Sequence, residues 1–329
     1  RYGTAEDLMY MIDELHRNKI GAILDFVPVH FAVDYYGLAK YDGSALYEYP
    51  NNDVGISEWG SNNFMHSRGE VRSFLQSCAN YWLRTFHFDG LRMDAISRII
   101  YWHGDEKRGV NGNAVDFIKY MNQGLKDRNP GCFLAAEDST NFANVTKSVS
   151  EGGLGFDYKW DMGWMHDTLS YFQMSPDDRY NNYHKLTFSM MYYYNEKFLL
   201  PLSHDEVVHG KATILQKMYG DYDIKFPQAR AFYMYMMVHP GKKLNYSQHR
   251  LSMAVILISW VMNWGSSGNG TKKGNKTLCF LIFLSIGHLT ITLQILTKII
   301  FPIQLFTEKN MITTVLNGWT VTPLTVLCT

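Results

Sequence analysis

Residues 89–95, DGLRMDA, contain an arginine and a carboxylate two positions apart. In an extended strand, residues i and i+2 point to the same side, so Arg92 and Asp94 project together while Leu91 and Met93 pack behind them. A cation beside a carboxylate stabilises the anion, which suits a nucleophile that must stay ionised while a second acid nearby stays protonated. Taken alone, the segment is equally typical of a structural Asp–Arg pair at a strand end.

Three further apolar runs end in ionisable residues. The apolar run 21–24 is followed by the segment from Asp25 to His30. The run 132–136 is followed by Glu137 and Asp138, and the run 198–202 by the segment from Ser203 to Glu206. Short apolar runs of this kind predict buried parallel strands. One acidic pair after a strand is usually a solvated loop or a helix cap, but four at the same end of successive strands indicate a functional site.

Segments with helical patterns separate these runs. Thr4 and Asp7 form a capping-box pattern ahead of apolar residues at helical spacing, namely Leu8, Met11, Ile12 and Leu15. Similar patterns occupy residues 70–86, 114–126 and 227–237. Strand, polar loop and helix in repetition predict an α/β fold of the (β/α)8 TIM-barrel type, whose active site lies at the C-terminal ends of the strands.

The four segments resemble, in order, the signature regions of the α-amylase superfamily of glycoside hydrolases and transglycosylases. Within that superfamily the chain is similar to bacterial glycogen (1,4-α-glucan) branching enzymes. The stretches that carry this resemblance are residues 47–69 (YEYPNNDVGISEWGSNNFMHSRG), 152–167 (GGLGFDYKWDMGWMHD) and 203–211 (SHDEVVHGK). The last discriminates best, because related hydrolases tend to lack its VVHGK continuation. The resemblance runs from residue 1 to about residue 245.

The resemblance implies roles for the matching residues. Asp94 matches the nucleophile, Glu137 the general acid/base, and Asp205 the third carboxylate, which orients the substrate hydroxyls. Arg92 matches the residue that keeps the nucleophile ionised. Sugar-binding positions of the cleavage subsite are matched by Asp25, His30 and His204.

The chemistry of these residue types agrees with that assignment. A retaining glycosidase needs one carboxylate to attack the anomeric carbon and one carboxylic acid, roughly 5 Å away, to protonate the leaving oxygen. Asp94 has the cation beside it. Glu137 follows an apolar strand, where loss of hydration is expected to raise its pKa and keep it protonated near neutral pH.

Aromatic residues of the Gly-rich stretch after residue 152 have two interpretations. Tyr158, Trp160 and Trp164 could stack on sugar faces, and Trp160 is the candidate for substrate binding. Alternatively, they fill the rim of the barrel, as large aromatic side chains usually do.

The spacing of the carboxylates does not decide which acceptor takes the sugar from the covalent glycosyl-enzyme intermediate. The resemblance implies transfer to the 6-hydroxyl of a glucan chain, which forms an α-1,6 branch. An amylase-type hydrolase would use water instead, and a third alternative is an inactive glucan-binding or membrane-tethered remnant.

Composition limits the partners. The 329 residues have a formal net charge of zero and no basic stripe, so a nucleic-acid partner is not expected. Four scattered cysteines show neither metal-ligand spacing nor a disulfide pattern, which fits a reducing cytoplasm, and Cys78 and Cys132 are expected to be buried thiols. No cofactor and no metal is expected, the predicted partner is an α-glucan such as glycogen or amylose, and the intact protein is expected to be a monomer.

The sequence changes character near residue 246, which predicts two parts: a partial catalytic barrel over 1–245 and a non-native tail over 246–329. After Asp223 the only acidic residue is Glu308. The apolar segments 278–286 and 291–306 are too short or too interrupted for membrane spans.

The codons for residues 259–272, read one frame over, can encode MGNELG followed by QFREWDE. This motif follows the eighth barrel strand in branching enzymes. We therefore hypothesise a reading-frame shift or an unremoved insertion.

The barrel is accordingly expected to be incomplete. By resemblance, strands about three to seven are present, the first two should precede Arg1, and the eighth is replaced by a disordered or irregular tail. Open strand edges favour aggregation. The chain alone is therefore expected to be aggregation-prone and essentially inactive.

Overall fold

A computed structural model describes residues 3–206, 212–249, 253–259 and 280–284. Its main sheet is a closed barrel in the order β1-β10-β9-β8-β7-β6-β5-β4. The bounds of these strands are β1 (Ile20–Phe26), β4 (Gly90–Met93), β5 (Phe133–Ala136), β6 (Tyr158–Trp160), β7 (Phe198–Leu202), β8 (Lys242–His249), β9 (Met253–Ser259) and β10 (Phe280–Leu284). From β1 through β4, β5, β6 and β7 to β8, every pairing is parallel, which confirms the predicted α/β fold class.

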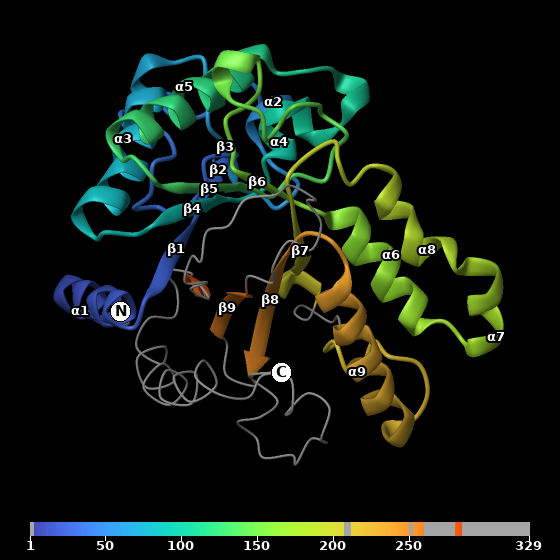
Figure 1. The fold of residues 1–329 in the computed structure, drawn as a ribbon. Coiled ribbons are helices and arrows are strands. Elements are labelled where there is room, and N and C mark those ends of the chain that lie inside the picture. The colour runs from blue at the N-terminus through green and yellow to red at the C-terminus, as the bar shows by residue number, and fades with distance from the viewer. Residues whose placement is uncertain (1–2, 207–211, 250–252, 260–279, 285–329) are drawn as a thin grey trace.

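Helices lie above the strands and on either side of them in Figure 1. Helices α3 and α5 lie on one side of the molecule, and α6 to α9 form a group on another. The helices are α1 (Ala5–Arg17), α2 (Asn52–Gly55), α3 (Gly69–Thr85), α4 (Ser97–Ile100), α5 (Gly112–Arg128), α6 (Met162–Gln173), α7 (Pro176–Arg179), α8 (His184–Thr187) and α9 (Tyr222–Val238). Short 3-10 turns occupy Trp102–Gly104, Glu106–Arg108, Val149–Glu151, Tyr180–Asn182, Phe188–Met191 and His204–Glu206.

The capping box predicted for the first helix is confirmed. The Asp7 amide donates to Thr4 Oγ1 at 3.2 Å, and the Thr4 amide donates to Asp7 Oδ2 at 2.8 Å, so both orphan donors at the start of α1 are satisfied. The four apolar residues expected on one face of α1, namely Leu8, Met11, Ile12 and Leu15, are all buried.

The core has three parts. One cluster fills the inside of the barrel with a residue from each of five strands, Ile23, Ala135, Trp160, Leu199 and Leu244. A larger cluster packs α1, α3 and α5 against β1, β4 and β5, and a third packs α6 and α9 against β7. Cys78 and Cys132, predicted to be buried thiols, are free and half-buried, and burial raises the pKa of both.

A repeated Phe-Asp pair fixes the register of the parallel strands. Before β4, Asp89 Oδ2 accepts from the amide of Ala22 in β1 at 2.7 Å, and before β6, Asp157 Oδ2 accepts from the amide of Leu134 in β5 at 2.8 Å. A basic side chain contacts each carboxylate, His16 at 2.9 Å from Asp89 and Lys126 at 2.8 Å from Asp157. The carboxylates thus anchor the ends of the strands opposite to those that carry the candidate site.

The described segments at and after the predicted boundary add three strands to the sheet, β8, β9 and β10. Strand β8 pairs in parallel with β7 through Lys242–Asn245 and is the sixth parallel strand of the sheet, so the prediction of an incomplete (β/α)8 barrel is confirmed. Strand β9 pairs antiparallel with β8 and with β10, and β10 lies parallel to β1, so the sheet is closed by strands that do not follow the parallel order of a (β/α)8 barrel. The sequences of β9 and β10, MAVILIS and FLIFL, are mostly apolar and half of their residues are β-branched or aromatic, which suits pairing with an exposed edge.

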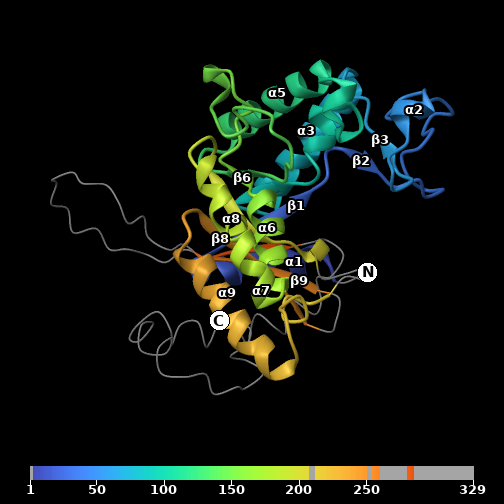
Figure 2. The same cartoon turned by 90° about the vertical axis from the view of Figure 1, so that its right-hand side faces the viewer.

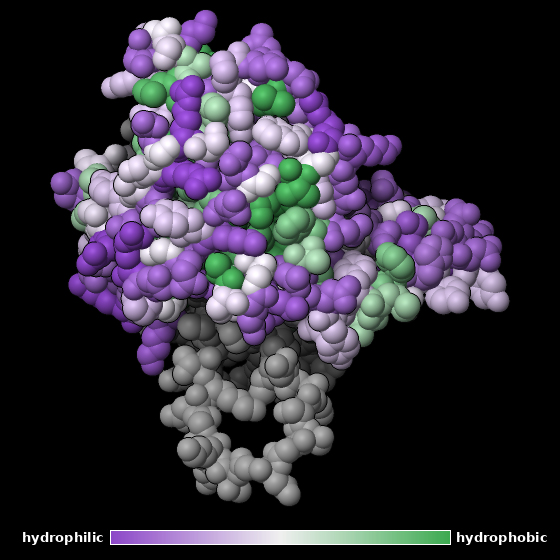
Figure 3. Space-filling view, turned by 90° about the horizontal axis from the view of Figure 1, so that it is seen from above, coloured by the Kyte–Doolittle hydropathy of each residue, from purple (hydrophilic) through white to green (hydrophobic). Residues whose placement is uncertain are grey.

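A long excursion between β1 and α3 holds β2 (His30–Phe31), α2 and β3 (Asn62–Asn63), and Figure 2 shows these elements projecting from one side of the molecule. The face seen in Figure 3 is mainly hydrophilic, with a confined hydrophobic patch near its centre. In the described part of the chain, no helix has both the length and the apolar character needed to cross a membrane.

Candidate active site

The ends of β4 and β5 bring together an arginine and two carboxylates. Arg92, in β4, donates from Nη1 to Asp94 Oδ1 at 2.9 Å and from Nη2 to Glu137 Oε2 at 2.7 Å. Asp94 follows the last residue of β4, and Glu137 follows the last residue of β5. The prediction that Arg92 and Asp94 project to the same side is confirmed, and Arg92 also reaches a second carboxylate from the neighbouring strand.

Backbone geometry fixes the two carboxylates. The Glu137 amide donates to the Met93 carbonyl at 3.0 Å and extends the β4–β5 ladder by one residue. The amide of Ala95 donates to Glu137 Oε2 at 3.1 Å, and Ala95 has a φ of 49°, in the left-handed region that few non-glycine residues adopt. This turn directly after Asp94 aims a backbone donor at Glu137.

Arg92 is itself enclosed. Its side chain is 2% exposed, its guanidinium lies 4.3 Å from the centre of the Trp160 ring, and its Nη1 lies 3.5 Å from Asp25 Oδ1. Trp160 has no exposed surface. In this structure the indole therefore positions Arg92 and presents no face to a sugar, contrary to the stacking interpretation. Trp164 is buried too, whereas Tyr158 is half-buried and stacks on Phe133.

Burial changes the acidity of Glu137. Loss of hydration raises the pKa of this carboxyl to about 7, with Arg92 opposing the shift and the Asp94 carboxylate adding to it. The rise matches the sequence-based expectation and follows from a buried carboxyl beside a like charge. Two carboxyl groups thus share one cation, and one of them keeps its proton near neutral pH.

The excursion after β1 adds a histidine and an exposed indole. His30 Nδ1 lies 2.7 Å from Ser61 Oγ, and the His30 ring lies 5.3 Å from the ring of Trp59. Burial lowers the pKa of His30 and the nearby Asp94 carboxylate opposes this, so the imidazole is neutral at pH 7. Trp59 is 57% exposed. The sequence analysis did not single out Trp59, although it lies within the stretch of residues 47–69.

Ion pairs hold this excursion against helix α4 and the 3-10 turn Glu106–Arg108, which follow β4. Arg98 Nη2 pairs with Glu58 Oε1 at 2.6 Å, and Arg108 Nη2 pairs with Asp53 Oδ2 at 2.5 Å. The Arg98 guanidinium lies 5.2 Å from the centre of the Trp59 ring. The indole next to His30 is therefore held in place on a loop that is fastened at several points.

The segment after β7 carries the third predicted carboxylate. Asp205 is exposed, and its amide lies 3.2 Å from Ser203 Oγ in the 3-10 turn His204–Glu206. Glu206 pairs with Lys217 at 3.0 Å. The His204 side chain lies outside the described residues, and so do residues 207–211. Convergence of Asp205 with Asp94 and Glu137 on one sugar-sized gap stays a prediction, supported by the shared strand direction of β4, β5 and β7.

A second buried pair braces the β5 end. Lys159 Nζ lies 2.8 Å from Asp138 Oδ2 and 2.6 Å from the Thr140 carbonyl, and both Lys159 and Asp138 are buried. Asp138 follows Glu137 directly, so this pair fixes the backbone that carries the acid. Among the residues that the structure describes, no group of three or more His, Cys, Asp or Glu side chains is arranged to hold a metal ion.

Comparison with known proteins gives the following relatives. No protein-family model matches the chain. The chain is 51% identical over 248 residues to the 1,4-alpha-glucan branching enzyme of Fusobacterium nucleatum, a match that covers 75% of this chain and 40% of that protein. It is 49% identical over 245 residues to the corresponding enzyme of Bacillus cereus, covering 74% of this chain and 38% of that protein. The chain thus spans about two fifths of the length of these relatives.

Two solved structures are similar in part. An α-amylase from Anoxybacillus has a TM-score of 0.44 and 14% identity, covering 79% of this chain and 66% of that one. A cyclomaltodextrinase has a TM-score of 0.49 and 17% identity, covering 75% and 41%.

Proposed function

We propose that this chain, a relative of bacterial 1,4-alpha-glucan branching enzymes over three quarters of its length, carries the glycosyl-transfer site of a branching enzyme. The substrate would be an α-1,4-linked glucan, and the product an α-1,6 branch. The catalytic unit would be residues 1–245. The observation that carries the proposal is the Arg92 guanidinium, which contacts Asp94 at 2.9 Å and Glu137 at 2.7 Å.

In the first step Glu137, protonated because of its raised pKa, donates its proton to the glycosidic oxygen. Asp94 attacks the anomeric carbon, the C–O bond to the leaving chain breaks, and a covalent glycosyl-enzyme forms. The Arg92 guanidinium holds the Asp94 carboxylate in place for this attack. Asp94 and Glu137 both contact the Arg92 guanidinium. This arrangement is compatible with the separation of roughly 5–5.5 Å between the two carboxyl groups of retaining enzymes.

In the second step the ionised Glu137 takes the proton from the 6-hydroxyl of an acceptor glucan. The acceptor oxygen attacks the anomeric carbon and releases Asp94, which leaves both carboxyl groups in their starting states. Water in place of the acceptor would give hydrolysis by the same residues. Asp205 orients the sugar hydroxyls, and Asp25, His30 and His204 bind the sugar. Trp59 offers the exposed ring beside His30 on which a glucose unit can stack.

The test replaces the matching segment of the Fusobacterium nucleatum enzyme with residues 1–245 of this chain. Incubated with amylose, the hybrid should lower the iodine colour with little rise in reducing ends, and Asp94→Asn should abolish the change. A parallel rise in reducing ends would identify a hydrolase instead. No reaction in a folded hybrid would count against catalysis by this segment. The unmodified chain of 329 residues is expected to be essentially inactive in the same assay.

A further inference from the structure

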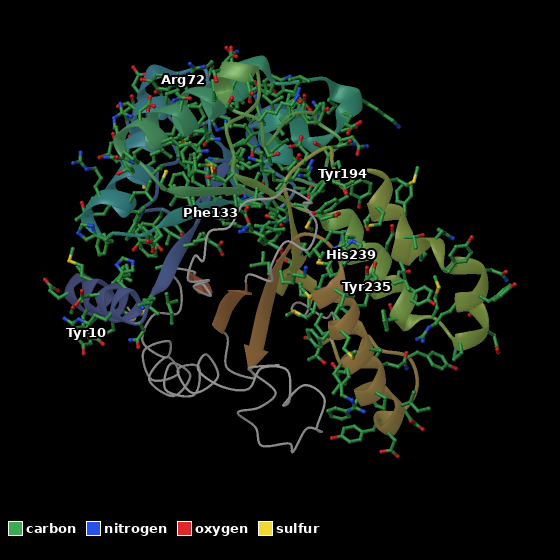
Figure 4. The ribbon with its side chains drawn as sticks, viewed as in Figure 1. Tyr10, Arg72, Phe133, Tyr194, Tyr235 and His239 are labelled. Carbon is green, nitrogen blue, oxygen red and sulfur yellow. The ribbon has the colours of Figure 1, made fainter. Side chains whose placement is uncertain are left out.

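A polar groove lies at the surface between α3 and α5, the helices that precede β4 and β5. Its volume is about 470 Å³, within the range of small-molecule sites. The lining includes Arg72, Gln76, Ser77 and Asn80 of α3 and Tyr120 and Arg128 of α5. Figure 4 labels Arg72 near the top of the view, in the part of the molecule that α3 and α5 occupy in Figure 1. No residue of the candidate active site belongs to this lining.

Both arginines of the groove keep their positive charge uncompensated. Arg72 donates from Nε to the His66 carbonyl at 2.6 Å and from Nη2 to the Asn113 carbonyl at 3.0 Å. Arg128 donates from Nη1 to the Gly124 carbonyl at 3.1 Å. Within the described part of the chain, neither guanidinium pairs with a carboxylate, and no acidic side chain lines the groove. Neutral carbonyl partners thus orient the two cations and leave their charge to an anionic ligand.

A buried amide faces the same groove. Gln76 is 8% exposed, and its Nε2 has no hydrogen-bond partner among the residues that the structure describes. A Cβ on Gly124 would lie 2.3 Å from this nitrogen and 2.8 Å from Arg128 Nη1, so the amide and the guanidinium lie side by side over the glycine. Buried donors are nearly always paired, so an unpaired one beside a cation indicates a place for an oxygen atom of a ligand.

The remaining polar groups of this end of the groove add donors. Asn80 Oδ1 accepts from Asn129 Nδ2 at 3.0 Å, which orients the Asn80 amide and leaves its NH2 group to donate. Ser77 is exposed and contributes a hydroxyl. Guanidinium and amide N–H groups in this number match a ligand group with several acceptor oxygens and a negative charge, and phosphate has both.

The size of the groove indicates more than a bare ion. Its volume exceeds that of a phosphate group, and Tyr120, which is 58% exposed, offers an aromatic face to the rest of a ligand. A nucleic acid would need a continuous cationic track, whereas the described lining has two cations. The dimensions and the charge therefore favour a small phosphate ester over a polyanion.

We propose that the groove between α3 and α5 binds a small phosphate ester, whose phosphate group lies against Gln76 and Arg128. This site is independent of the proposed function, because none of the residues in the transfer site takes part. Helix α3 leads into β4 and helix α5 into β5, so a ligand that bridges the two helices ties together the elements that precede Asp94 and Glu137. Binding to the folded state alone also stabilises the chain.

The first test is equilibrium dialysis of the full chain against radiolabelled inorganic phosphate, with chloride holding the ionic strength constant. Phosphate should occupy a single saturable site. Arg128→Gln and Gln76→Glu should each raise the Kd about tenfold, since each removes a hydrogen bond to a charged group. The Gln76→Glu change keeps the shape of the side chain and places a carboxylate beside Arg128, where it competes with the phosphate.

Matched controls carry the same substitutions outside the groove. Arg84→Gln alters an exposed arginine in the last turn of α3, and Gln173→Glu alters an exposed glutamine at the end of α6. Both should keep the Kd of the original chain. The absence of saturable binding would overturn the proposal, and so would a control that weakens binding as much as its partner variant.

Competition identifies the ligand class. Glucose 6-phosphate should displace the labelled phosphate at lower concentration than unlabelled inorganic phosphate does, and glucose should not displace it. Equal displacement by the ester and by inorganic phosphate would overturn the ester and assign the groove to free phosphate. Stronger displacement by polyuridylate, or displacement by the neutral sugar maltoheptaose, would also refute the proposal.

The second test needs no variant. Hydrogen exchange of the full chain is measured with and without glucose 6-phosphate, and peptides that span residues 69–80 and 120–128 should exchange more slowly with the ester. Protection confined to other segments would place the phosphate elsewhere and would contradict the site between α3 and α5.

Discussion

Arg92 is 2% exposed and touches the carboxylates of Asp94 and Glu137 at 2.9 and 2.7 Å. Arg92→Ala leaves these two groups in a poorly hydrated site without their cation. Breaking such a buried pair costs about 3–5 kcal/mol of unfolding free energy. We expect that loss at pH 8 and a smaller one at pH 5, where protonation of Glu137 relieves the repulsion. Urea unfolding at both pH values measures it, and equal losses would contradict this charge balance.

Glu137 links stability to pH. Its pKa is about 7 in the folded chain and is raised above the ordinary value of 4.5, so between these values the folded state holds a proton that the unfolded state has lost. This group therefore favours folding at low pH, and its contribution is lost as pH rises towards 7. Glu137→Gln should flatten that fall by up to a few kcal/mol, as urea unfolding from pH 4 to 8 would reveal. An unchanged slope would show an ordinary pKa.

The raised pKa of Glu137 also predicts that the activity falls on the alkaline side of the pH–rate profile. Initial transfer by the hybrid enzyme should decline above about pH 7, because ionised Glu137 cannot protonate the leaving oxygen. Initial rates of iodine-colour loss from pH 5 to 9 measure this. A profile that stays flat to pH 9 would mean that Glu137 is not the acid.

At the scale of elements, β4 and β5 hold the reacting groups through close backbone contact. A Cβ on Gly90, the first residue of β4, would lie 2.1 Å from the Phe133 carbonyl oxygen in β5. Gly90→Ala must therefore push the strands apart, and we expect a loss of at least about 2 kcal/mol in unfolding free energy. Gly69→Ala is the control, since a Cβ there meets nothing within 4 Å at the start of α3. Similar stabilities of the two variants would contradict the close approach.

At the scale of the whole molecule, closure depends on strands from the tail. Within the described residues, β9 and β10 lie between the edges of β8 and β1. A chain that ends at His249 exposes the edges of β1 and β8 and should aggregate. A chain that ends at Leu284 should not. Light scattering after size-exclusion chromatography compares them, and a monomeric shorter chain would argue against barrel closure by the tail.

Local patterns in the sequence determined the order of strands, the face of α1, the Thr4 capping box and the positions of Asp94 and Glu137 at strand ends. These features depend on residues a few positions apart. The relatives confirm the resemblance to branching enzymes that residues 47–69, 152–167 and 203–211 predicted. The boundary at residue 245 and the individual site roles stay predictions.

Only the tertiary structure decided which groups meet and which are buried. Arg92 and Glu137 are 45 residues apart, and their contact exists because β4 and β5 are neighbours in the barrel. Trp160 is enclosed and Trp59 is exposed, although nothing in their flanking residues distinguishes a core indole from a surface one. The raised pKa of Glu137 and the pairing of the tail with β1 likewise depend on what the rest of the chain packs around them. Hydration and strand pairing are set by distant neighbours, which a linear pattern does not specify.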